Sequence, residues 1–248
     1  MTSLPSAYAP PSDLLQGRRI LVTGAGDGLG RATALACARH GATVVLLGRT
    51  VKKLEAVYDA IEATGGPTPA IYPLNLAGAS WKDYAELAET VERELGGLEG
   101  IVHCAAHFKN FGRLVDIDPK EWIESLQVNL SGPFALTRFL MPLLEGAADG
   151  ASVVFVSDRH GREAHAYDGI YGITKAATEQ MMRIWAAELP EHSKVRLNSF
   201  DPGPLRTALR LKGFPGELDS ESPPPETATP ALLWLLGPDS RDARGRAF

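Results

Sequence analysis

The sequence predicts an α/β protein, a single domain built on a doubly wound parallel sheet with helices on both faces. Three observations lead to this fold class. Short, continuously apolar runs recur along the chain, as expected for strands that are buried on both faces. Longer segments with helical periodicity lie between the runs, and this alternation indicates right-handed βαβ units. A glycine-rich turn joins the first run to the first helical segment.

The individual elements follow from these runs and from the residues that stop them. Glycines end three of the helical patterns, at Gly41, Gly65 and Gly96. Residues 120–144 are predicted to form one long helix, which Pro133 and Pro142 disturb. The predicted strands are 19–23, 43–47, 70–74, 100–103, 152–156 and 195–200. The predicted helices are 29–40, 51–63, 80–95, 120–144, 169–189 and 227–236.

We expect one domain over residues 16–248. Prolines in residues 1–15 predict a flexible N-terminal arm before it. A second proline-rich segment, 214–225, also carries acidic residues and is either a disordered linker or a mobile lid. Its place in the chain favours a lid, which we expect to cover a substrate site with residues 204–225.

Composition argues against several classes of function. The formal net charge is −5, and the absence of a basic patch disfavours nucleic acid or a membrane surface as partner. No apolar run approaches the length of a membrane span, and the N-terminus does not resemble a signal peptide. Cys37 and Cys104 lie in apolar stretches without zinc-site spacing. We therefore expect buried thiols, no metal and a cytoplasmic location.

The glycine-rich turn is a candidate dinucleotide site. Its spacing is G-x-x-x-G-x-G through Gly24, Gly28 and Gly30, because Leu29 occupies the third glycine position of the strict G-x-G-x-x-G pattern. Glycines let backbone N–H groups approach a pyrophosphate, and the following helix presents its positive end to that anion. A Rossmann-type fold is therefore expected, with Asp27 and Leu29 also bordering the nucleotide. A glycine-rich turn without a ligand is the alternative.

The end of the second run predicts which nicotinamide nucleotide binds. A carboxylate about 20 residues after the turn would bind the ribose 2′-hydroxyl of NAD. Arg49 stands there instead, and a guanidinium suits a 2′-phosphate through charge-assisted contacts. The sequence therefore favours NADP(H) over NAD(H). Against this, Asp27 places negative charge near the phosphates, and Arg49 is also compatible with the solvent-exposed start of a helix.

Tyr171 and Lys175 are the candidate acid–base pair. They are four residues apart in a predicted helix, so both side chains share one face. A nearby ammonium favours the phenolate and lowers the pKa of a tyrosine from about 10. Such a tyrosine can protonate a carbonyl oxygen as hydride arrives, or deprotonate an alcohol in the reverse direction.

With these motifs in order, the sequence resembles the classical short-chain dehydrogenase/reductase family over about residues 18–237. It is most similar to NADP-type members of an enterobacterial YciK-like group. The resemblance implies a homodimer or homotetramer that pairs through the helices carrying Asn129 and Tyr171. The matching motifs are Thr23-Gly24-x-x-x-Gly28-x-Gly30, Asn129 in Val128-Asn129-Leu130, Tyr171-x-x-x-Lys175 and Pro202-Gly203.

The resemblance also implies roles for individual residues. Asn129 would hold a water that links Lys175 to solvent, and Lys175 would also bind the nicotinamide ribose. Asn75 and Leu76 would border the adenine. The nicotinamide and the diphosphate would contact Pro202, Gly203 and Thr207.

Three departures from the family pattern affect the expected chemistry. Asp158 stands thirteen residues before Tyr171, where a hydroxyl-donating serine is usual, and an ionised carboxylate cannot donate a hydrogen bond. Either a protonated Asp158 or Ser157 would replace that donor, or the substrate needs an acceptor there. The segment His103-Cys104-Ala105-Ala106 replaces Asn-Asn-Ala-Gly, so a methyl group stands at Ala106 where backbone passes the cofactor. Asn75 replaces a common aspartate, with little expected effect.

Two hypotheses follow. The first is an NADP(H)-dependent oxidoreductase that interconverts a carbonyl and an alcohol on a small molecule, with the Tyr171–Lys175 pair as acid–base machinery. The second is a nucleotide-binding regulatory or scaffold protein with little turnover, because Asp158 replaces the serine. His160 and His165, with Arg159 and Arg162, are interpreted as a solvated polar loop, with a substrate-carboxylate site as the alternative.

Overall fold

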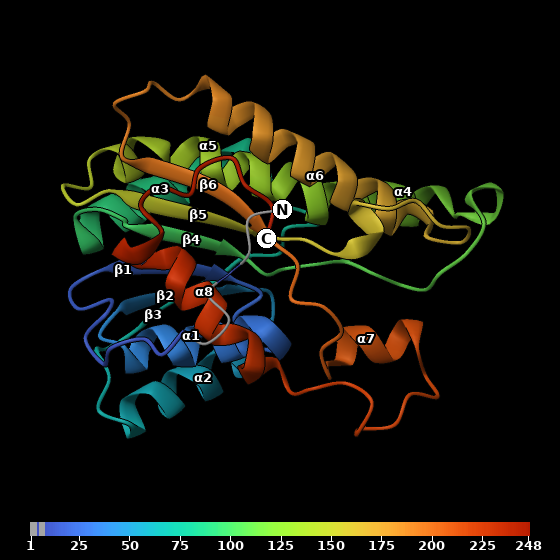
Figure 1. Cartoon of the computed structure of the whole chain (residues 1–248), viewed down its shortest axis with the longest axis horizontal. Coiled ribbons are helices and arrows are strands. Elements are labelled where there is room, and N and C mark those ends of the chain that lie inside the picture. Colours follow the sequence, from blue (N-terminus) through green and yellow to red (C-terminus); the bar gives the residue numbers. More distant parts are fainter. Residues whose placement is uncertain (1–3, 5–7) are drawn as a thin grey trace.

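The computed structural model describes residue 4 and residues 8–248. It contains a six-stranded, all-parallel sheet in the order β3-β2-β1-β4-β5-β6, with helices on both faces (Figure 1). The predicted fold class is confirmed. The strands are β1 (Arg19–Thr23), β2 (Thr43–Gly48), β3 (Ala70–Pro73), β4 (Gly100–His103), β5 (Ala151–Val156) and β6 (Val195–Phe200).

The sheet separates two layers of helices, and each layer encloses its own hydrophobic cluster. Helices α1, α2 and α8 cover one face, and α3, α5 and α6 cover the other (Figure 1). Side chains of β1 alternate between the clusters, with Ile20 and Val22 in one and Leu21 in the other. The helices are α1 (Gly28–Arg39), α2 (Val51–Ala63), α3 (Trp81–Leu95), α4 (Pro119–Leu126), α5 (Gly132–Glu145), α6 (Gly169–Glu188), α7 (Ala208–Gly213) and α8 (Thr229–Leu236).

The helix expected over 120–144 is instead two helices joined by a π-helical turn over Gln127–Ser131. Proline has no N–H group, so Pro133 cannot donate to the carbonyl of Asn129, four residues earlier. The hydroxyl of Thr178, on α6, donates to that carbonyl at 2.9 Å. A proline thus frees a backbone acceptor, and a side chain of the neighbouring helix satisfies it.

Segments near both ends of the described chain pack against the domain. The expected arm includes residues 1–3 and 5–7, which lie outside the described residues, whereas Leu15 is fully buried in the core. Near the other end, Ala247 forms a parallel bridge with Ser199 of β6. No helix within the described part of the chain is long and apolar enough to cross a membrane.

The segment 204–225, where we expected a lid, contains α7, which the sequence did not predict. Thr207 caps this short helix by accepting a hydrogen bond from the Arg210 N–H at 3.2 Å. Figure 1 shows α7 standing away from the sheet, beyond the α1 and α8 layer. A lid function for this segment stays a prediction.

His103 is an ionisable residue in the core, at the carboxyl end of β4. Its ring stacks on Phe155 at 4.8 Å between centroids, and Nε2 lies 2.9 Å from the Thr137 hydroxyl. Burial lowers the pKa of His103 from 6.5 to about 3. The histidine is therefore neutral in the folded protein well below the pH at which it gains a proton in the unfolded chain.

This difference predicts a loss of stability in mild acid. Below about pH 6.5 the unfolded chain binds a proton that folded His103 does not, so the free energy of unfolding falls as the pH falls. His103 should remove about 2 kcal/mol between pH 7.5 and pH 5. Urea unfolding of wild type and His103→Asn at both pH values tests this, because the variant should lack that part of the pH dependence. Equal pH dependence of the two proteins would contradict it.

Candidate active site

A cleft of about 580 Å³ opens at the carboxyl edge of the sheet. It lies where the strand order reverses between β1 and β4, the position at which doubly wound sheets bind ligands. Residues that follow each of the six strands line it, so segments far apart in sequence meet there. Every residue expected to border the nucleotide lines the cleft, and so do the expected catalytic residues Tyr171, Lys175, Asp158 and Ser157, whereas Asn129 does not.

The glycine turn is built by close packing. Gly24 has φ +66°, and a Cβ there would lie 3.0 Å from the backbone of Ala105. A Cβ on Gly30 would lie 2.2 Å from the carbonyl oxygen of Gly24, so the first turn of α1 touches the loop directly. Asp27 caps α1 by accepting from the Gly28 N–H at 2.8 Å. The sequence predicted this glycine spacing, and the contacts give its physical reason.

The cleft wall beside β2 carries cations. Arg49 is exposed, lines the cleft, and has no hydrogen bond or ion pair recorded among the described residues. Lys53 of α2 also lines the cleft, and its ammonium pairs with Asp27. That hydrogen bond is the main reason why the pKa of Asp27 is lowered. The negative charge expected near the phosphates is therefore compensated by a lysine that the sequence analysis overlooked.

Tyr171, Lys175 and Asp158 form a polar group in the cleft, in which Tyr171 and Lys175 are buried and Asp158 is partly exposed. The Tyr171 hydroxyl donates to Asp158 Oδ2 at 3.2 Å. The Lys175 ammonium donates to the carbonyl of Val156 at 2.7 Å and lies 5.5 Å from the centre of the Tyr171 ring. Tyr171 and Lys175 therefore share one face of α6, as predicted, and Asp158 contacts Tyr171 beside them.

The electrostatics of this group differ from the expectation. Burial, and then the charge and hydrogen bond of Asp158, hold the pKa of Tyr171 well above 10. Burial lowers the pKa of Lys175, and Asp158 opposes that effect. In the nucleotide-free protein Tyr171 is therefore held in its protonated form, and the lowering by Lys175 expected from the sequence does not prevail.

Asn129 positions backbone and is not itself a cleft-lining residue. Its Oδ1 accepts from the His107 N–H at 2.6 Å, and its Nδ2 donates to the His107 carbonyl at 2.9 Å. Nδ2 also donates to the Thr174 hydroxyl at 3.1 Å. The amide therefore ties the segment after β4 to α6, and its side-chain oxygen is already engaged. The implied water relay at Asn129 stays a prediction.

The side chains of Ser157 and Asp158 lie in different environments. The Ser157 side chain is buried beside the Glu179 carboxylate and lowers the pKa of that group. Glu179 also holds Arg162 at 2.7 Å, so Arg162 is an internal ion-pair partner and does not belong to a solvated loop. Of the two residues expected to contact the substrate oxygen, Asp158 is the one brought to Tyr171.

The segment after β4 carries no backbone strain. Tyr167 is the one non-glycine residue with positive φ in the described chain, so Ala106 fits its position without the cost considered for a left-handed residue. The Ala105 N–H donates to the Thr23 hydroxyl at 3.0 Å. Burial raises the pKa of Cys104 to about 12, which makes an inert thiol.

The remaining predicted nucleotide residues border the cleft from two sides. Asn75 and Leu76 follow β3, and the Asn75 side chain accepts from the Ala77 N–H at 3.3 Å. Pro202, Gly203 and Thr207 follow β6 on the opposite side. A Cβ on Gly28 would lie 3.2 Å from Thr207 Cγ2, so the glycine turn and the start of the expected lid are in contact range.

Aromatic rings close the end of the cleft near Tyr171. Phe108 lies 5.0 Å from Tyr171 between ring centroids and 4.9 Å from Phe111, which lies 5.5 Å from Phe214. His160 also lines the cleft, 5.1 Å from Phe111. The sequence alone does not place these rings together, because they come from three separate segments that meet only on folding.

Comparisons with known proteins agree with this geometry. Residues 18–217 match the family model for short chain dehydrogenases. The chain is 39% identical to the oxidoreductase YciK of Escherichia coli K12 over 97% of its own length and 94% of the relative. A short chain dehydrogenase from Salmonella enterica superposes with a TM-score of 0.94 at 39% identity, covering 97% and 98% of the two chains. A structure from E. coli CFT073, complexed with NADPH, superposes with a TM-score of 0.92 at 39% identity, covering 96% and 98%.

Gly30→Ala should weaken nucleotide binding, because the new methyl group must displace the Gly24 carbonyl. We expect the affinity for NADPH, measured by fluorescence titration, to fall at least about tenfold, or about 1.4 kcal/mol. Gly78→Ala is the control, since a Cβ there meets no atom within 4 Å. Unchanged affinity in a folded Gly30→Ala protein would show that the turn does not hold the nucleotide.

Proposed function

The chain belongs to the short chain dehydrogenase family of oxidoreductases, and we propose that it uses NADP(H) to interconvert a carbonyl and an alcohol on a small molecule. The observation that carries this proposal is the contact of Tyr171 with Asp158 beside Lys175, in the cleft that the glycine turn lines. A hydroxyl donor, a buried ammonium and an anion-binding turn are the parts that such a reaction needs.

Tyr171 acts as the proton donor in the reducing direction. When bound, NADPH supplies the hydride that reduces the carbonyl carbon. Tyr171 gives its hydroxyl proton to the carbonyl oxygen, and the Lys175 ammonium stabilises the phenolate that remains. Burial and Asp158 keep Tyr171 protonated, so the proton that carbonyl reduction consumes is in place.

Arg49 and Lys53 support a preference for NADP(H). No carboxylate follows β2, where NAD-binding proteins usually place one. The guanidinium of Arg49, which has no partner in the described part of the chain, can bind a 2′-phosphate in a bidentate way, and Lys53 neutralises Asp27 beside it. The NADPH complex of the E. coli CFT073 protein supports the same nucleotide.

The regulatory alternative rested on the replacement of the usual serine by Asp158. In the structure Asp158 contacts the Tyr171 hydroxyl and lines the cleft, as a working member of the site would. No observation specifically favours a protein without turnover.

A homodimer or homotetramer stays part of the proposal, supported by apolar side chains on the α5–α6 face, where Phe134 and Ile184 are 37% and 50% exposed.

Tyr171→Phe tests the acid–base role. The phenyl ring keeps the packing against Phe108 but has no proton to give, so reduction should slow about 10²- to 10⁴-fold. The assay follows NADPH absorbance with a panel of aldehydes and ketones, beginning with aromatic compounds such as 4-nitrobenzaldehyde because Phe108, Phe111 and Phe214 line the cleft. NADPH affinity should change little. Retained turnover in the variant would overturn the role of Tyr171.

Arg49→Ala tests the nucleotide preference. Wild type should bind NADPH more tightly than NADH, and the variant should reduce that gap by about 1.5–3 kcal/mol, the scale of a hydrogen bond to a charged group. Lys52→Ala is the matched control, because Lys52 is exposed three residues further, at the start of α2, but does not line the cleft. Equal affinities of the wild-type protein for the two nucleotides would refute the preference.

A further inference from the structure

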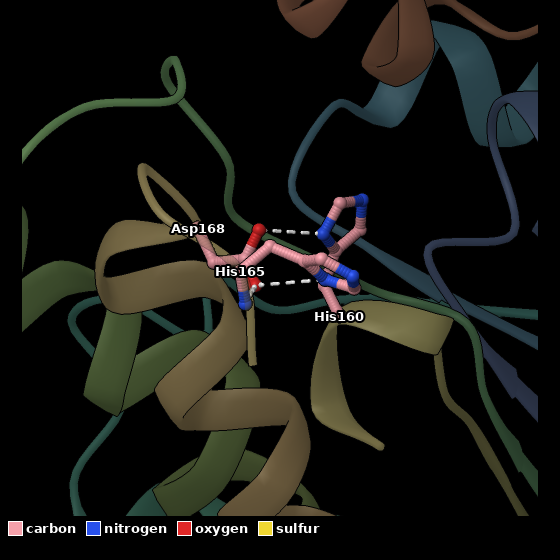
Figure 2. A group of neighbouring side chains, drawn as sticks. All are labelled: His160, His165 and Asp168. Atoms are coloured by element: carbon pink, nitrogen blue, oxygen red, sulfur yellow. Dashed lines mark hydrogen bonds and ion pairs between the residues drawn. The ribbon is translucent and has the colours of Figure 1, made fainter. Parts of the chain in front are cut away.

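A second histidine–carboxylate arrangement lies next to the proposed proton donor. His160 and Asp168 come from the segment between β5 and α6, and Figure 2 shows the Asp168 carboxylate facing the rings of both His160 and His165. His160 Nδ1 lies 2.7 Å from Asp168 Oδ1, and the backbone N–H of His165 donates to Asp168 Oδ2 at 2.8 Å. The His160 and Asp168 side chains are only 14% and 11% exposed.

Two glycines bring this segment close to the catalytic helix. A Cβ on Gly161 would lie 2.7 Å from backbone and side-chain atoms of Lys175. A Cβ on Gly172 would lie 2.9 Å from Asp168 Cβ and 3.0 Å from the His160 carbonyl. Both contacts are closer than real Cβ atoms tolerate, so the position of His160 against α6 depends on these glycines.

The contact with Asp168 fixes which ring nitrogen of His160 carries a proton. An ionised carboxylate only accepts hydrogen bonds, so Nδ1 must be the donor. Its hydrogen therefore occupies the lone-pair direction that a metal ion would need, which argues against a metal site here. Nε2 then lies on the opposite side of the ring, 3.8 Å from Asp158 Oδ1.

Asp158 is thus placed between two groups. Its Oδ2 accepts from the Tyr171 hydroxyl at 3.2 Å, and its Oδ1 accepts from the backbone N–H of His160 at 3.1 Å. The His160 Nε2 atom lies 3.8 Å from the same Oδ1, which is ion-pair range for a protonated imidazole but longer than a hydrogen bond. The ionisable groups that face His160 are Asp158, Asp168, His165 at 6.2 Å and Tyr171 at 6.5 Å between rings.

We propose that His160, oriented by Asp168, exchanges a proton with Tyr171 through Asp158. This inference rests on the proposed function, and it gives the residue that replaces the family's serine a positive role. His160 acts through Asp158 and Asp168 acts through His160, so both are positioning and relay residues that do not touch the substrate.

Every proton in the reducing direction is accounted for. The carbonyl carbon gains the hydride, and its oxygen gains the proton of Tyr171, which leaves a phenolate. The Nε2 proton of protonated His160 moves to Asp158 once a small rotation of either side chain closes the 3.8 Å gap, and then to the phenolate oxygen, so Tyr171 is restored. His160 becomes neutral with its Nδ1 proton still on Asp168, and it regains a proton from water in the open cleft.

The kinetic test compares His160→Asn with His165→Asn. His165 also lies beside Asp168 but has no contact with Asp158, so it is the matched control. We expect His160→Asn to lower kcat for NADPH-dependent reduction of 4-nitrobenzaldehyde, or of the fastest carbonyl compound in the panel, roughly 10²-fold with little change in KM. Added imidazole should restore part of the rate to His160→Ala. Equal rates in the His160→Asn and His165→Asn proteins would overturn the relay.

A double substitution separates a relay from a purely structural effect. If the proton passes through Asp158, removing His160 should cost nothing further once Asp158→Asn is present. Independent, additive losses in the double variant would contradict the proposal. Loss of activity in Tyr171→Phe, without any effect of His160→Asn, would refute the relay while leaving the proposed function intact.

A measurement without nucleotide or substrate keeps the inference independent of turnover. In ¹⁵N-histidine NMR of the nucleotide-free protein, His160 should show a protonated Nδ1, and Asp168→Asn should abolish that state. Asp158→Asn should shift the Nε2 signal, whereas His165→Asn should leave it in place. An Nε2 signal that does not shift in the Asp158→Asn protein would show that His160 and Asp158 exchange no proton.

Discussion

The arrangement of the site depends on one buried cation. The Lys175 ammonium is held by the Val156 carbonyl at the end of β5. Burial lowers the pKa of Lys175, and the nearby carboxylates of Asp158, Asp201 and Glu179 oppose that effect. This contact joins α6 to the carboxyl edge of the sheet. Because Tyr171 stands one turn earlier on the same helix, fixing Lys175 also fixes the phenol over the cleft.

The parts of the fold set by local patterns could be predicted from the sequence. Continuous apolar runs placed all six strands to within a residue at each end, because parallel strands buried on both faces leave an unambiguous signal. The spacing of Gly24, Gly28 and Gly30 is also local, since the turn and the start of α1 are consecutive in the chain. The pairing of Tyr171 with Lys175 follows from helical geometry alone.

Features that depend on contacts between distant segments were not predictable. Pro133 suggested a disturbed helix, but the π-helical turn also needs Thr178, 49 residues beyond Asn129, to satisfy the freed carbonyl. Lys53 belongs to no sequence motif, and its ion pair with Asp27 arises only because α2 packs beside the glycine turn. His160 looked like a solvated histidine because the sequence does not reveal that Gly161 and Gly172 seat it against α6.

Of the departures from the family pattern, the replacement by Asp158 has the most contacts within the site. Asp158 raises the pKa of Tyr171, faces His160 and opposes the lowering of the Lys175 pKa, so one replacement changes the charge balance of the whole site. Ala106, in contrast, is accommodated without a left-handed backbone. The site is therefore a rearranged version of the usual acid–base machinery, with a carboxylate where a neutral hydroxyl is expected.

The most direct test of this account is a crystal structure of the protein with NADP⁺ bound. We expect the pyrophosphate over Gly24, Gly28 and Gly30, the 2′-phosphate on Arg49, and the nicotinamide ring beside the Tyr171 hydroxyl with Asp158 still in contact. A nucleotide bound outside this cleft, or a nicotinamide ring remote from Tyr171, would contradict the account.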